Sequence, residues 1–238
     1  MATIILHEAG TRGHANHGWL DSHHTFSFAG YQNAERIHFG ALRVMNDDIV
    51  KAGTGFGKHP HDNMEIVSIP LKGALEHRDT TGRHAIIRSG DVQIMSAGSG
   101  IAHSEMNASK SEDVNFLQIW VFPKLRDIAP RYGQLTFDAA GRVNNWQVVV
   151  SPEETPERLW INQDAWFVLG DWDKGRETTY SIHKKGNGVY VFNISGGVTV
   201  NGQLLKARDG AGISGVEEIA IQVQEKAQLL MIEVPMKF

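Results

Sequence analysis

The chain of 238 residues carries 23 basic and 27 acidic side chains, a net charge of −4, which argues against a direct nucleic-acid partner bound through its phosphates. Cysteine is absent, so disulfides and thiolate metal sites are excluded and any metal must be bound through nitrogen and oxygen. Because the start of the chain lacks a basic, apolar leader and no apolar stretch approaches the roughly 20 residues of a membrane span, we expect a cytoplasmic protein without a membrane partner.

The first half of the chain is predicted to contain a series of short strands. Residues 11–28 are rich in histidine, glycine and aromatic residues without a clear period, and we expect an ordered loop that ends in a short strand at Phe26–Phe28. Turn signals follow, among them Asn46–Asp48, and they separate short β-type runs. These runs are expected at residues 38–45, 63–71, 74–77, 84–88, 91–95 and 116–122.

The second half repeats this pattern after a connector that contains Pro123 and Pro130. Its expected strands are at residues 145–150, 165–170, 178–183, 189–194, 198–200, 219–224 and 229–234. Helix is scarce, and a single turn within Ser151–Leu159 is the one candidate. Closely spaced short strands predict an all-β sandwich or barrel fold. We place two domains at residues 1–135 and 136–238.

Histidine is unevenly distributed, and this places the expected chemistry in the first domain. Eleven of the 12 histidines lie at or before His103. The two halves can also be aligned as a repeat, with Gly73 on Gly197 and Ser96 on Ser214. In this alignment the candidate metal ligands of the first half, described next, fall on His183, Lys185, Ile221 and Val223. The second domain is therefore predicted to keep the scaffold and to lack the ligands.

Two short motifs carry the candidate metal site. His59 and His61 are separated by one residue, and so are His103 and Glu105. In an extended strand, side chains at i and i+2 point to the same face, so each pair can aim at one point. Pro60 predicts a strand edge or bulge, because proline donates no hydrogen bond to a neighbouring strand. Three imidazoles and one carboxylate suit a mononuclear site for a borderline divalent ion.

The roles of several neighbouring residues stay open. Glu65 is expected to orient a ligand or to satisfy backbone groups. Core packing competes with a role in lining a pocket for Phe56, Met64 and Met106, while Arg43 and Gln118 lie on strands whose inward face the sequence does not fix. His23 and His24 are placed equally well at the site or on the surface. His77 and His84 are predicted at the surface, and His183 is predicted to be structural.

The two motifs resemble those of the cupin superfamily, and the opening segment Arg12-Gly-His-Ala-Asn-His-Gly-Trp-Leu-Asp-Ser-His-His-Thr-Phe-Ser-Phe28 resembles that of the pirin family of bicupins. The cupin-like patterns are Gly53-x5-His59-x-His61-x3-Glu65-x7-Gly73 and Gly90-x5-Ser96-Ala-Gly98-x4-His103. The resemblance implies two tandem jelly-roll-like β-barrels with a metal in the N-terminal barrel only. It implies that the ligands are His59, His61, His103 and Glu105 and that Glu65 is not a ligand.

The resemblance also implies a reaction. Bacterial pirins of this type are linked to quercetin 2,3-dioxygenase activity, in which dioxygen opens the flavonol heterocycle and carbon monoxide is released. A Lewis-acidic metal would bind the deprotonated 3-hydroxyl group, and Glu105 is the candidate catalytic base. Iron(II) is the first expectation by family, while nickel, manganese, cobalt, copper and zinc fit the same nitrogen and oxygen donors.

Two other functions compete with a flavonol dioxygenase acting on quercetin and dioxygen. The first is a metal- or redox-responsive regulatory protein that acts through a protein partner, because family members outside bacteria are linked to transcription regulation. The second is an oxygenase or isomerase with a different small-molecule substrate, because cupin sites host many chemistries. A pocket large enough for a flavonol would favour turnover, and a closed site would favour sensing. We expect a monomer.

Overall fold

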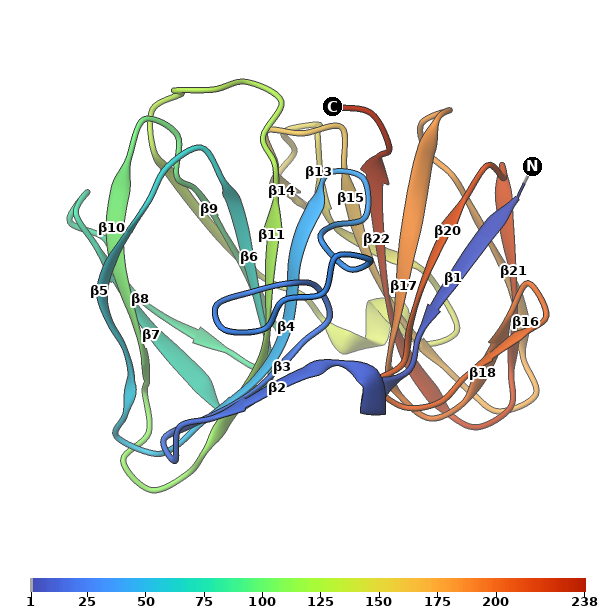
Figure 1. Ribbon diagram of the computed structural model, residues 1–238, viewed down its shortest axis with the longest axis horizontal. Helices are drawn as coiled ribbons and strands as arrows, with labels where there is room; N and C mark the ends of the chain where they lie inside the picture. Colours follow the sequence, from blue (N-terminus) through green and yellow to red (C-terminus); the bar gives the residue numbers. More distant parts are fainter. Residues whose placement is uncertain (1) are drawn as a thin grey trace.

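The structure, a computed structural model, describes residues 2–238 as two β-barrels that lie side by side (Figure 1). Helix is limited in these residues to two short 3-10 segments, η1 (Ala9–Thr11) and η2 (Ala139–Arg142). The prediction of an all-β fold with two tandem cupin-type barrels is confirmed. No helix among residues 2–238 has the length and apolar character that crossing a bilayer requires.

The first barrel is built from a seven-stranded and a four-stranded antiparallel sheet. The larger sheet, in spatial order, contains β12 (Arg131–Thr136), β9 (Asp91–Ser96), β6 (Glu65–Lys72), β11 (Val114–Val121), β4 (Leu42–Val50), β3 (Leu20–His24) and β2 (Gly13–Asn16). The smaller sheet contains β5 (Gly55–His61), β10 (Ile101–Asn107), β7 (Ala74–Asp79) and β8 (His84–Arg88).

The second barrel has the same two sheets. Its larger sheet contains β1 (Thr3–His7), β20 (Gly210–Ser214), β17 (Asn187–Ser195), β22 (Ala227–Pro235), β15 (Trp166–Trp172), β13 (Gln147–Ser151) and β14 (Leu159–Trp160). Its smaller sheet contains β16 (Glu177–Ser181), β21 (Glu218–Val223), β18 (Val198–Val200) and β19 (Gln203–Leu205).

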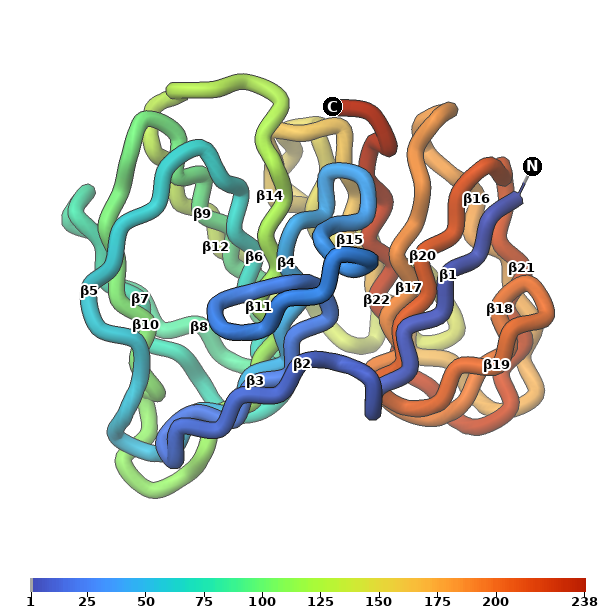
Figure 2. Tube along the Cα trace, viewed as in Figure 1, coloured from blue at the N-terminus to red at the C-terminus, as the bar shows by residue number. Residues whose placement is uncertain are grey.

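The strand orders of the two barrels correspond position by position, as the repeat in the sequence predicts. In the smaller sheets β5-β10-β7-β8 matches β16-β21-β18-β19, so Ile221 and Val223 lie on the strand equivalent to that of His103 and Glu105. The edge positions filled by β12 and β1 also correspond. Because β1 belongs to the second barrel, the chain crosses back to the first barrel before β2 begins (Figure 2).

The largest apolar core lies between the barrels, where the two larger sheets face each other. It joins residues such as Val67 and Ile119 of the first barrel to Phe167 and Ile232 of the second. The other face of each larger sheet looks into its own barrel. Strands such as β6 and β11 are therefore buried on both faces, which removes the simple alternation of polar and apolar residues that a strand with one exposed face would show.

The interiors of the two barrels differ in polarity and in packing. The second barrel is filled by one continuous apolar cluster, which includes Ile221 and Val223. The interior of the first barrel holds two smaller apolar clusters, one around Phe116 and one around Met95. Buried polar side chains and a cavity take up the remaining space, as described below.

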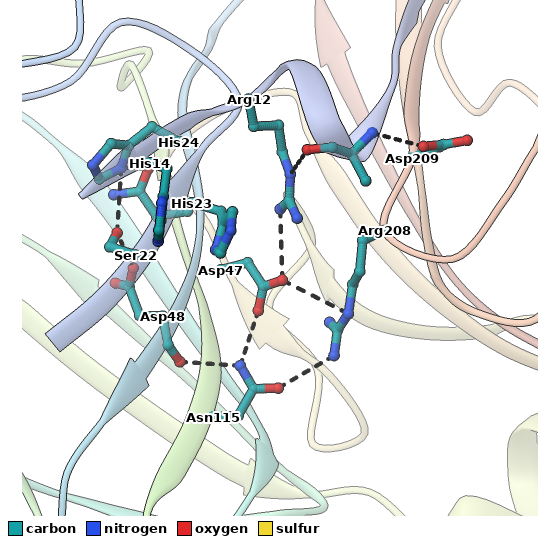
Figure 3. A network of polar contacts seen from close by, with 12 residues as sticks. Arg12, His14, Ser22, His23, His24, Asp47, Asp48, Asn115, Arg208 and Asp209 are labelled. Atoms are coloured by element: carbon teal, nitrogen blue, oxygen red, sulfur yellow. Dashed lines mark hydrogen bonds and ion pairs between the residues drawn. The ribbon is translucent and has the colours of Figure 1, made fainter. Parts of the chain in front are cut away.

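Charged residues join the N-terminal segment and both barrels at one side of the seam (Figure 3). Asp47 of β4 lies 3.5 Å from the Arg12 guanidinium and 3.7 Å from that of Arg208, which comes from the second barrel. Asn115 of β11 donates to Asp47 at 2.9 Å and accepts from Arg208 at 3.3 Å. Burial lowers the pKa of Arg12, and the Asp47 carboxylate opposes this shift. The network fixes β4, whose other face lines the cavity.

Three local predictions were wrong. Residues 11–28 do not form a loop that ends in a strand at Phe26–Phe28: they contain the antiparallel hairpin of β2 and β3, and Phe28 makes only an isolated bridge to Tyr31. Asn46–Asp48 is not a turn but the middle of β4, because the flanking apolar residues pair along both β3 and β11 and the three polar side chains have buried partners. Ser151–Leu159 contains no helical turn: Ser151 ends β13 and Leu159 begins β14, with a bridged turn between Thr155 and Arg158. Pro156 within that turn disfavours the α conformation of the residue before it and lacks a hydrogen-bond donor.

Candidate metal centre

Three of the four predicted metal ligands converge across two neighbouring strands. His59 on the edge strand β5 is paired directly with His103 on β10, and His61 lies two residues further along β5. One nitrogen of each ring lies within 4.8 Å of the corresponding nitrogens of the other two. The edge position of β5 agrees with the interpretation of Pro60, whose missing N–H would break the pattern of a central strand.

The protonation of these imidazoles suits a metal ligand. Nδ1 of His59 donates to the Gly57 carbonyl at 2.7 Å, which leaves Nε2 with its lone pair. Burial, followed by the neighbouring His59, lowers the pKa of His61 to about 4. Burial and the two neighbouring imidazoles lower the pKa of His103 to about 2. His61 and His103 therefore offer neutral nitrogens at neutral pH, which is the form that binds metals.

An unpartnered atom tests whether the cluster fits a metal. Nε2 of His103 is buried and has no hydrogen-bond partner among residues 2–238. A buried polar atom without a partner is unfavourable by about 1–3 kcal/mol, and such atoms are rare in folded proteins. Because this nitrogen belongs to the cluster of three imidazoles, a divalent ion bound there would satisfy it. The donor set therefore fits a borderline transition metal.

Glu105 lies beside the three histidines, outside their 4.8 Å cluster. A register shift in the pairing of β10 with β5 falls between His103 and Glu105, so Glu105 pairs with Phe56. Its carboxylate accepts from Gln118 Nε2 at 2.7 Å and lies 3.2 Å from Ser68 Oγ. Burial raises the pKa of Glu105 to about 7, although these two hydrogen bonds act in the opposite direction. The carboxyl group is thus balanced between its neutral and ionised forms near neutral pH.

A cavity of about 750 Å³ opens beside the cluster, within the usual range for small-molecule sites. His59, His61 and Glu105 line it, together with aromatic side chains that include Phe28 and Trp120. Of the residues left open above, Phe56, Gln118 and His24 also line the cavity.

The other open residues lie elsewhere. Met64 packs beside Trp120 against the apolar cluster around Met95, and Arg43 donates to the carbonyls of Ser27 and Ile37. His23 is half-exposed and stacks on His14, and neither His23 nor Met106 lines the cavity. The contacts of His183 agree with its predicted structural role. Its ring stacks on that of Trp166 with centroids 5.0 Å apart, and its Nδ1 lies 3.0 Å from Glu233 Oε2.

His77 is a functional candidate that the sequence prediction missed. It was expected at the surface, but its side chain is fully buried, whereas His84 is exposed as predicted. His77 Nε2 lies 2.9 Å from Asp79 Oδ2, and its Nδ1 lies 3.5 Å from Nδ1 of His103. Sequence patterns gave one indirect signal, since His77 and Asp79 are themselves an i, i+2 pair on a strand.

The contacts of Asp79 fix the positions of the protons in the contacts that lead from Asp79 through His77 to His103. Burial opposes ionisation, but hydrogen bonds from His77, Thr81 and Arg83 hold the pKa of Asp79 below its usual value. The carboxylate therefore accepts from His77 Nε2–H, which leaves His77 Nδ1 as an acceptor for His103 Nδ1–H. This tautomer presents Nε2 of His103 with a free lone pair towards the cluster. A carboxylate that orients a ligand imidazole through a further group is a common feature of metal sites.

Replacing His77 with alanine should weaken metal binding by roughly 10- to 100-fold, because the tautomer and orientation of His103 would no longer be fixed. Competition with a chromophoric chelator measures this affinity. His84→Ala, which removes an exposed histidine from the neighbouring strand, should leave the affinity unchanged. Equal affinities of the His77→Ala variant and the unaltered protein would contradict the role of His77.

Glu65 faces away from the cavity, so the prediction that it orients a ligand was wrong. Its Oε2 accepts from Ser96 Oγ at 2.8 Å and from the backbone N–H of Asn162 in the second barrel at 3.2 Å. The predicted role in satisfying backbone groups is therefore confirmed, at the seam between the barrels. Burial raises the pKa of Glu65 to about 7, and its Oε1 has no partner among the described residues.

The effect of the Glu65→Gln substitution on the free energy of unfolding should be more stabilising at pH 8 than at pH 5. In the unfolded chain Glu65 ionises near pH 4.5 and in the fold near pH 7, so its contribution to stability is lost as the pH rises through this window. Glutamine does not ionise, so the variant lacks this loss. The unfolding free energy of the variant minus that of the unaltered protein should therefore rise by roughly 2 kcal/mol between pH 5 and pH 8. Urea unfolding at both pH values measures it, with exposed Glu112→Gln as control. A difference that does not change with pH would contradict the prediction.

A second group of possible ligands lies on the β2–β3 hairpin. His14 pairs across the strands with His23, and Asp21 Oδ1 lies 2.8 Å from His14 Nε2 and 3.7 Å from His23 Nδ1. All three side chains are more than one third exposed, and no polar atom of the group is both buried and unpartnered. The cluster of His59, His61 and His103, which contains a buried nitrogen without a partner, is therefore the stronger candidate centre.

Comparison with known protein families gives two matches that together cover most of the chain. Residues 6–121 match the Pirin family model, and residues 148–234 match the model of the quercetinase C-terminal cupin domain. A relative from Escherichia coli K12 named quercetin 2,3-dioxygenase is 42% identical over 236 residues, which is 98% of this chain and 99% of the relative. A pirin-like protein of Caulobacter vibrioides is 40% identical over 222 residues, covering 93% and 95% of the two chains.

Solved structures agree with these matches. The crystal structure of the bacterial pirin YhhW from Escherichia coli in complex with nickel(II) has a TM-score of 0.92, 40% identity and coverage of 98% of this chain and 99% of that chain. Quercetin 2,3-dioxygenase from Acinetobacter baumannii is 19% identical, with a TM-score of 0.77 and coverage of 99% and 87%. This second likeness extends to the fold alone.

Proposed function

This chain belongs to the pirin family, with two cupin barrels, and on that basis we propose that it is a metal-dependent dioxygenase of flavonols such as quercetin. The reaction consumes one dioxygen, cleaves the oxygen heterocycle and releases carbon monoxide with a depside as the second product. Relatives that carry the name of this activity support the proposal.

The observation that carries the proposal is the position of the cluster of three imidazoles beside a cavity of about 750 Å³, which His59 and His61 line. Its predominantly apolar and aromatic lining suits a flat aromatic substrate. A metal site that serves only for sensing does not need an adjoining cavity of this size. The cavity therefore favours turnover over the alternative of a regulatory protein that acts through a partner.

We propose that His59, His61, His103 and Glu105 hold the metal. When bound, a divalent ion would supply Lewis acidity for the substrate oxygen and a site for redox chemistry with dioxygen. Iron(II) is our first choice, and the nickel-bound relative makes nickel the next ion to test. Because the donors are nitrogen and oxygen, manganese, cobalt, copper and zinc belong in the same series.

Glu105 is the proposed base for the 3-hydroxyl proton of the flavonol. Its pKa of about 7 in the metal-free protein matches the requirement that a base accept and release a proton near neutral pH. Gln118 holds one carboxylate oxygen, and Ser68 lies within reach of the other, so the group is positioned before substrate enters. The Trp120 and Phe28 rings would exclude water from the bound substrate.

Aerobic turnover of quercetin by protein of known metal content tests the proposal. We expect loss of quercetin together with release of one carbon monoxide per substrate, and loss of both signals in a His59→Ala/His61→Ala variant. Protein reconstituted with each ion of the series at one equivalent should include at least one active form. Full metal occupancy without carbon monoxide release from any of these forms would overturn the proposed activity.

A further inference from the structure

A row of polar residues crosses five strands of the larger sheet, and three of its members, His24, Asn46 and Gln118, line the cavity. The strand register places one polar residue of each strand beside the next, and all five are buried. The row consists of His24, Asn46, Gln118, Ser68 and Gln93. Its centre, at Gln118 and Ser68, holds Glu105 beside the metal cluster, while the outer end on β3 and β4 makes no hydrogen bond to Glu105 among the described residues.

Two residues of the row, His24 of β3 and Asn46 of β4, form this outer end. Ser22 of β3 and Asp48 of β4 are paired next to them and complete a group of four side chains. Each is at most 4% exposed, and each lines the cavity. Ser22 Oγ donates to Asp48 Oδ1 in a short hydrogen bond (Figure 3). His24 Nδ1 lies 3.0 Å from Asn46 Oδ1. Since a carbonyl oxygen can only accept, His24 Nδ1 carries the proton and His24 Nε2 is an acceptor.

These internal contacts leave a defined set of polar atoms unused. No hydrogen bond among residues 2–238 engages Asp48 Oδ2, Asn46 Nδ2 or His24 Nε2. The free set thus comprises two N–H donors on Asn46, one imidazole acceptor and one carboxyl oxygen. Buried side chains of this kind are normally paired, and an apolar ligand would leave them without partners at an unfavourable free energy.

A continuous aromatic wall connects this polar end to the metal cluster. The His24 ring lies 5.3 Å from Phe28, the Phe28 ring lies 5.3 Å from Trp120, and the Trp120 ring lies 4.9 Å from His61. All four rings line the same cavity. Asn46 is one strand away from Gln118 and His24 is two strands away, so the polar end lies about 5–10 Å along the sheet from the group that holds Glu105.

We propose that Ser22, His24, Asn46 and Asp48 form a recognition subsite for a pair of adjacent hydroxyl groups on an aromatic ring of the substrate. This inference rests on the proposed function, because it assumes that the chelating end of the same molecule lies at the metal cluster. Each hydroxyl of such a pair donates one hydrogen bond and accepts others. The donors match His24 Nε2 and Asp48 Oδ2, and the acceptors match the N–H groups of Asn46.

The subsite explains why the interior of the first barrel contains these four polar residues, while that of the second barrel is filled by apolar side chains. A polar pocket discriminates strongly against a ligand that lacks the matching hydroxyls, since the buried groups are then left unpaired. The substrate class is accordingly a flavonol that carries a dihydroxylated outer ring. A flavonol without hydroxyls on that ring would keep the aromatic contacts and lose the polar ones.

Equilibrium binding of two flavonols tests the subsite without requiring turnover. Quercetin and galangin differ only in the two adjacent hydroxyls of the outer ring. Full-length protein loaded with zinc is titrated with each compound by calorimetry in the absence of oxygen. We expect quercetin to bind at least about tenfold more tightly than galangin, which corresponds to one or two well-formed hydrogen bonds.

Two variants test whether the preference for quercetin over galangin arises at the proposed subsite. Asp48→Asn, and separately Asn46→Leu, should reduce the ratio of the two dissociation constants to near one while galangin affinity changes little. His84→Ala, which removes an exposed histidine that does not line the cavity, should keep the ratio of the unaltered protein. Melting curves of each variant confirm folding, and the ratio in the unaltered protein tests the subsite even where one variant fails to fold.

The outcomes separate the subsite from the proposed activity. No preference for quercetin in the unaltered protein, or a preference that survives both substitutions, would overturn the subsite. A preference that disappears in the variants would support it, even where no carbon monoxide is released and the proposed activity fails. Conversely, carbon monoxide release with equal binding of both compounds would support the activity and overturn the subsite.

Discussion

His61→Ala protein is expected to lose its divalent metal on dialysis, whereas the unaltered protein retains about one equivalent. The substitution removes one of three imidazoles that converge from β5 and β10. Ligands of a protein metal site each contribute several kcal/mol, so losing one lowers the affinity by on the order of a hundredfold or more. Elemental analysis by mass spectrometry after dialysis measures the metal content.

The control for this experiment is His17→Ala, which removes an exposed histidine near the same cavity and should leave the metal content unchanged. Full occupancy in the His61→Ala protein would remove His61 from the set of ligands. Equal losses in both variants would instead show that histidine content as a whole, and not this cluster, determines metal retention.

Replacing Glu105 with glutamine is expected to separate metal binding from turnover. The three imidazoles remain, so most of the metal should be retained, and glutamine can keep its contact with the Gln118 side chain after a rotation of either amide. The variant has no group able to accept the 3-hydroxyl proton at this position. General bases contribute about 10²- to 10⁴-fold, so carbon monoxide release should fall by at least 100-fold.

Rates are measured as carbon monoxide released per metal ion, which corrects for any loss of metal. Glu112→Gln, which neutralises an exposed carboxylate after β10, should be as active as the unaltered protein. Unchanged turnover in the Glu105→Gln protein would rule out the base role, and complete loss of metal would show that its carboxylate is an indispensable ligand.

The sequence was sufficient for the fold class and for the three histidines because both depend on local spacing. His59 and His61 lie one residue apart, so alternation along β5 fixes their common face without knowledge of the partner strand. The repeat was also visible in the sequence, because Gly73 follows β6 and the pair Gly196–Gly197 follows β17, which is the equivalent strand of the second barrel. The loss of ligands in the second barrel follows directly from that alignment.

The polar row could not be predicted, because its five members come from five strands that are paired in non-sequential order. Asn46 and Asp48 were assigned to a turn because polar residues beside an aspartate usually mark one, and nothing local shows that β4 continues through them. Burial of both faces of the larger sheet removes the alternation that would have placed Gln118 inward and Glu65 outward.

The buried His77 was missed for a related reason. Its position depends on the pairing of β7 with β10, which brings residues about 26 positions apart in the chain into contact. Strand register of this kind is set by tertiary packing and is not encoded in the short segment itself. Similarly, no local signal shows that β1 completes the second barrel. This position depends on the pairing of β1 with β20, which lies about 200 residues later in the chain.

The most direct test of the account is a crystal structure of the metal-loaded protein, with the ion located by anomalous scattering and quercetin introduced without oxygen. We predict one ion bonded to His59, His61, His103 and Glu105, with the flavonol in the cavity and its dihydroxylated ring against Asn46 and Asp48. An ion found instead at the exposed group on the β2–β3 hairpin, with His59, His61 and His103 free of metal, would contradict the proposed metal centre.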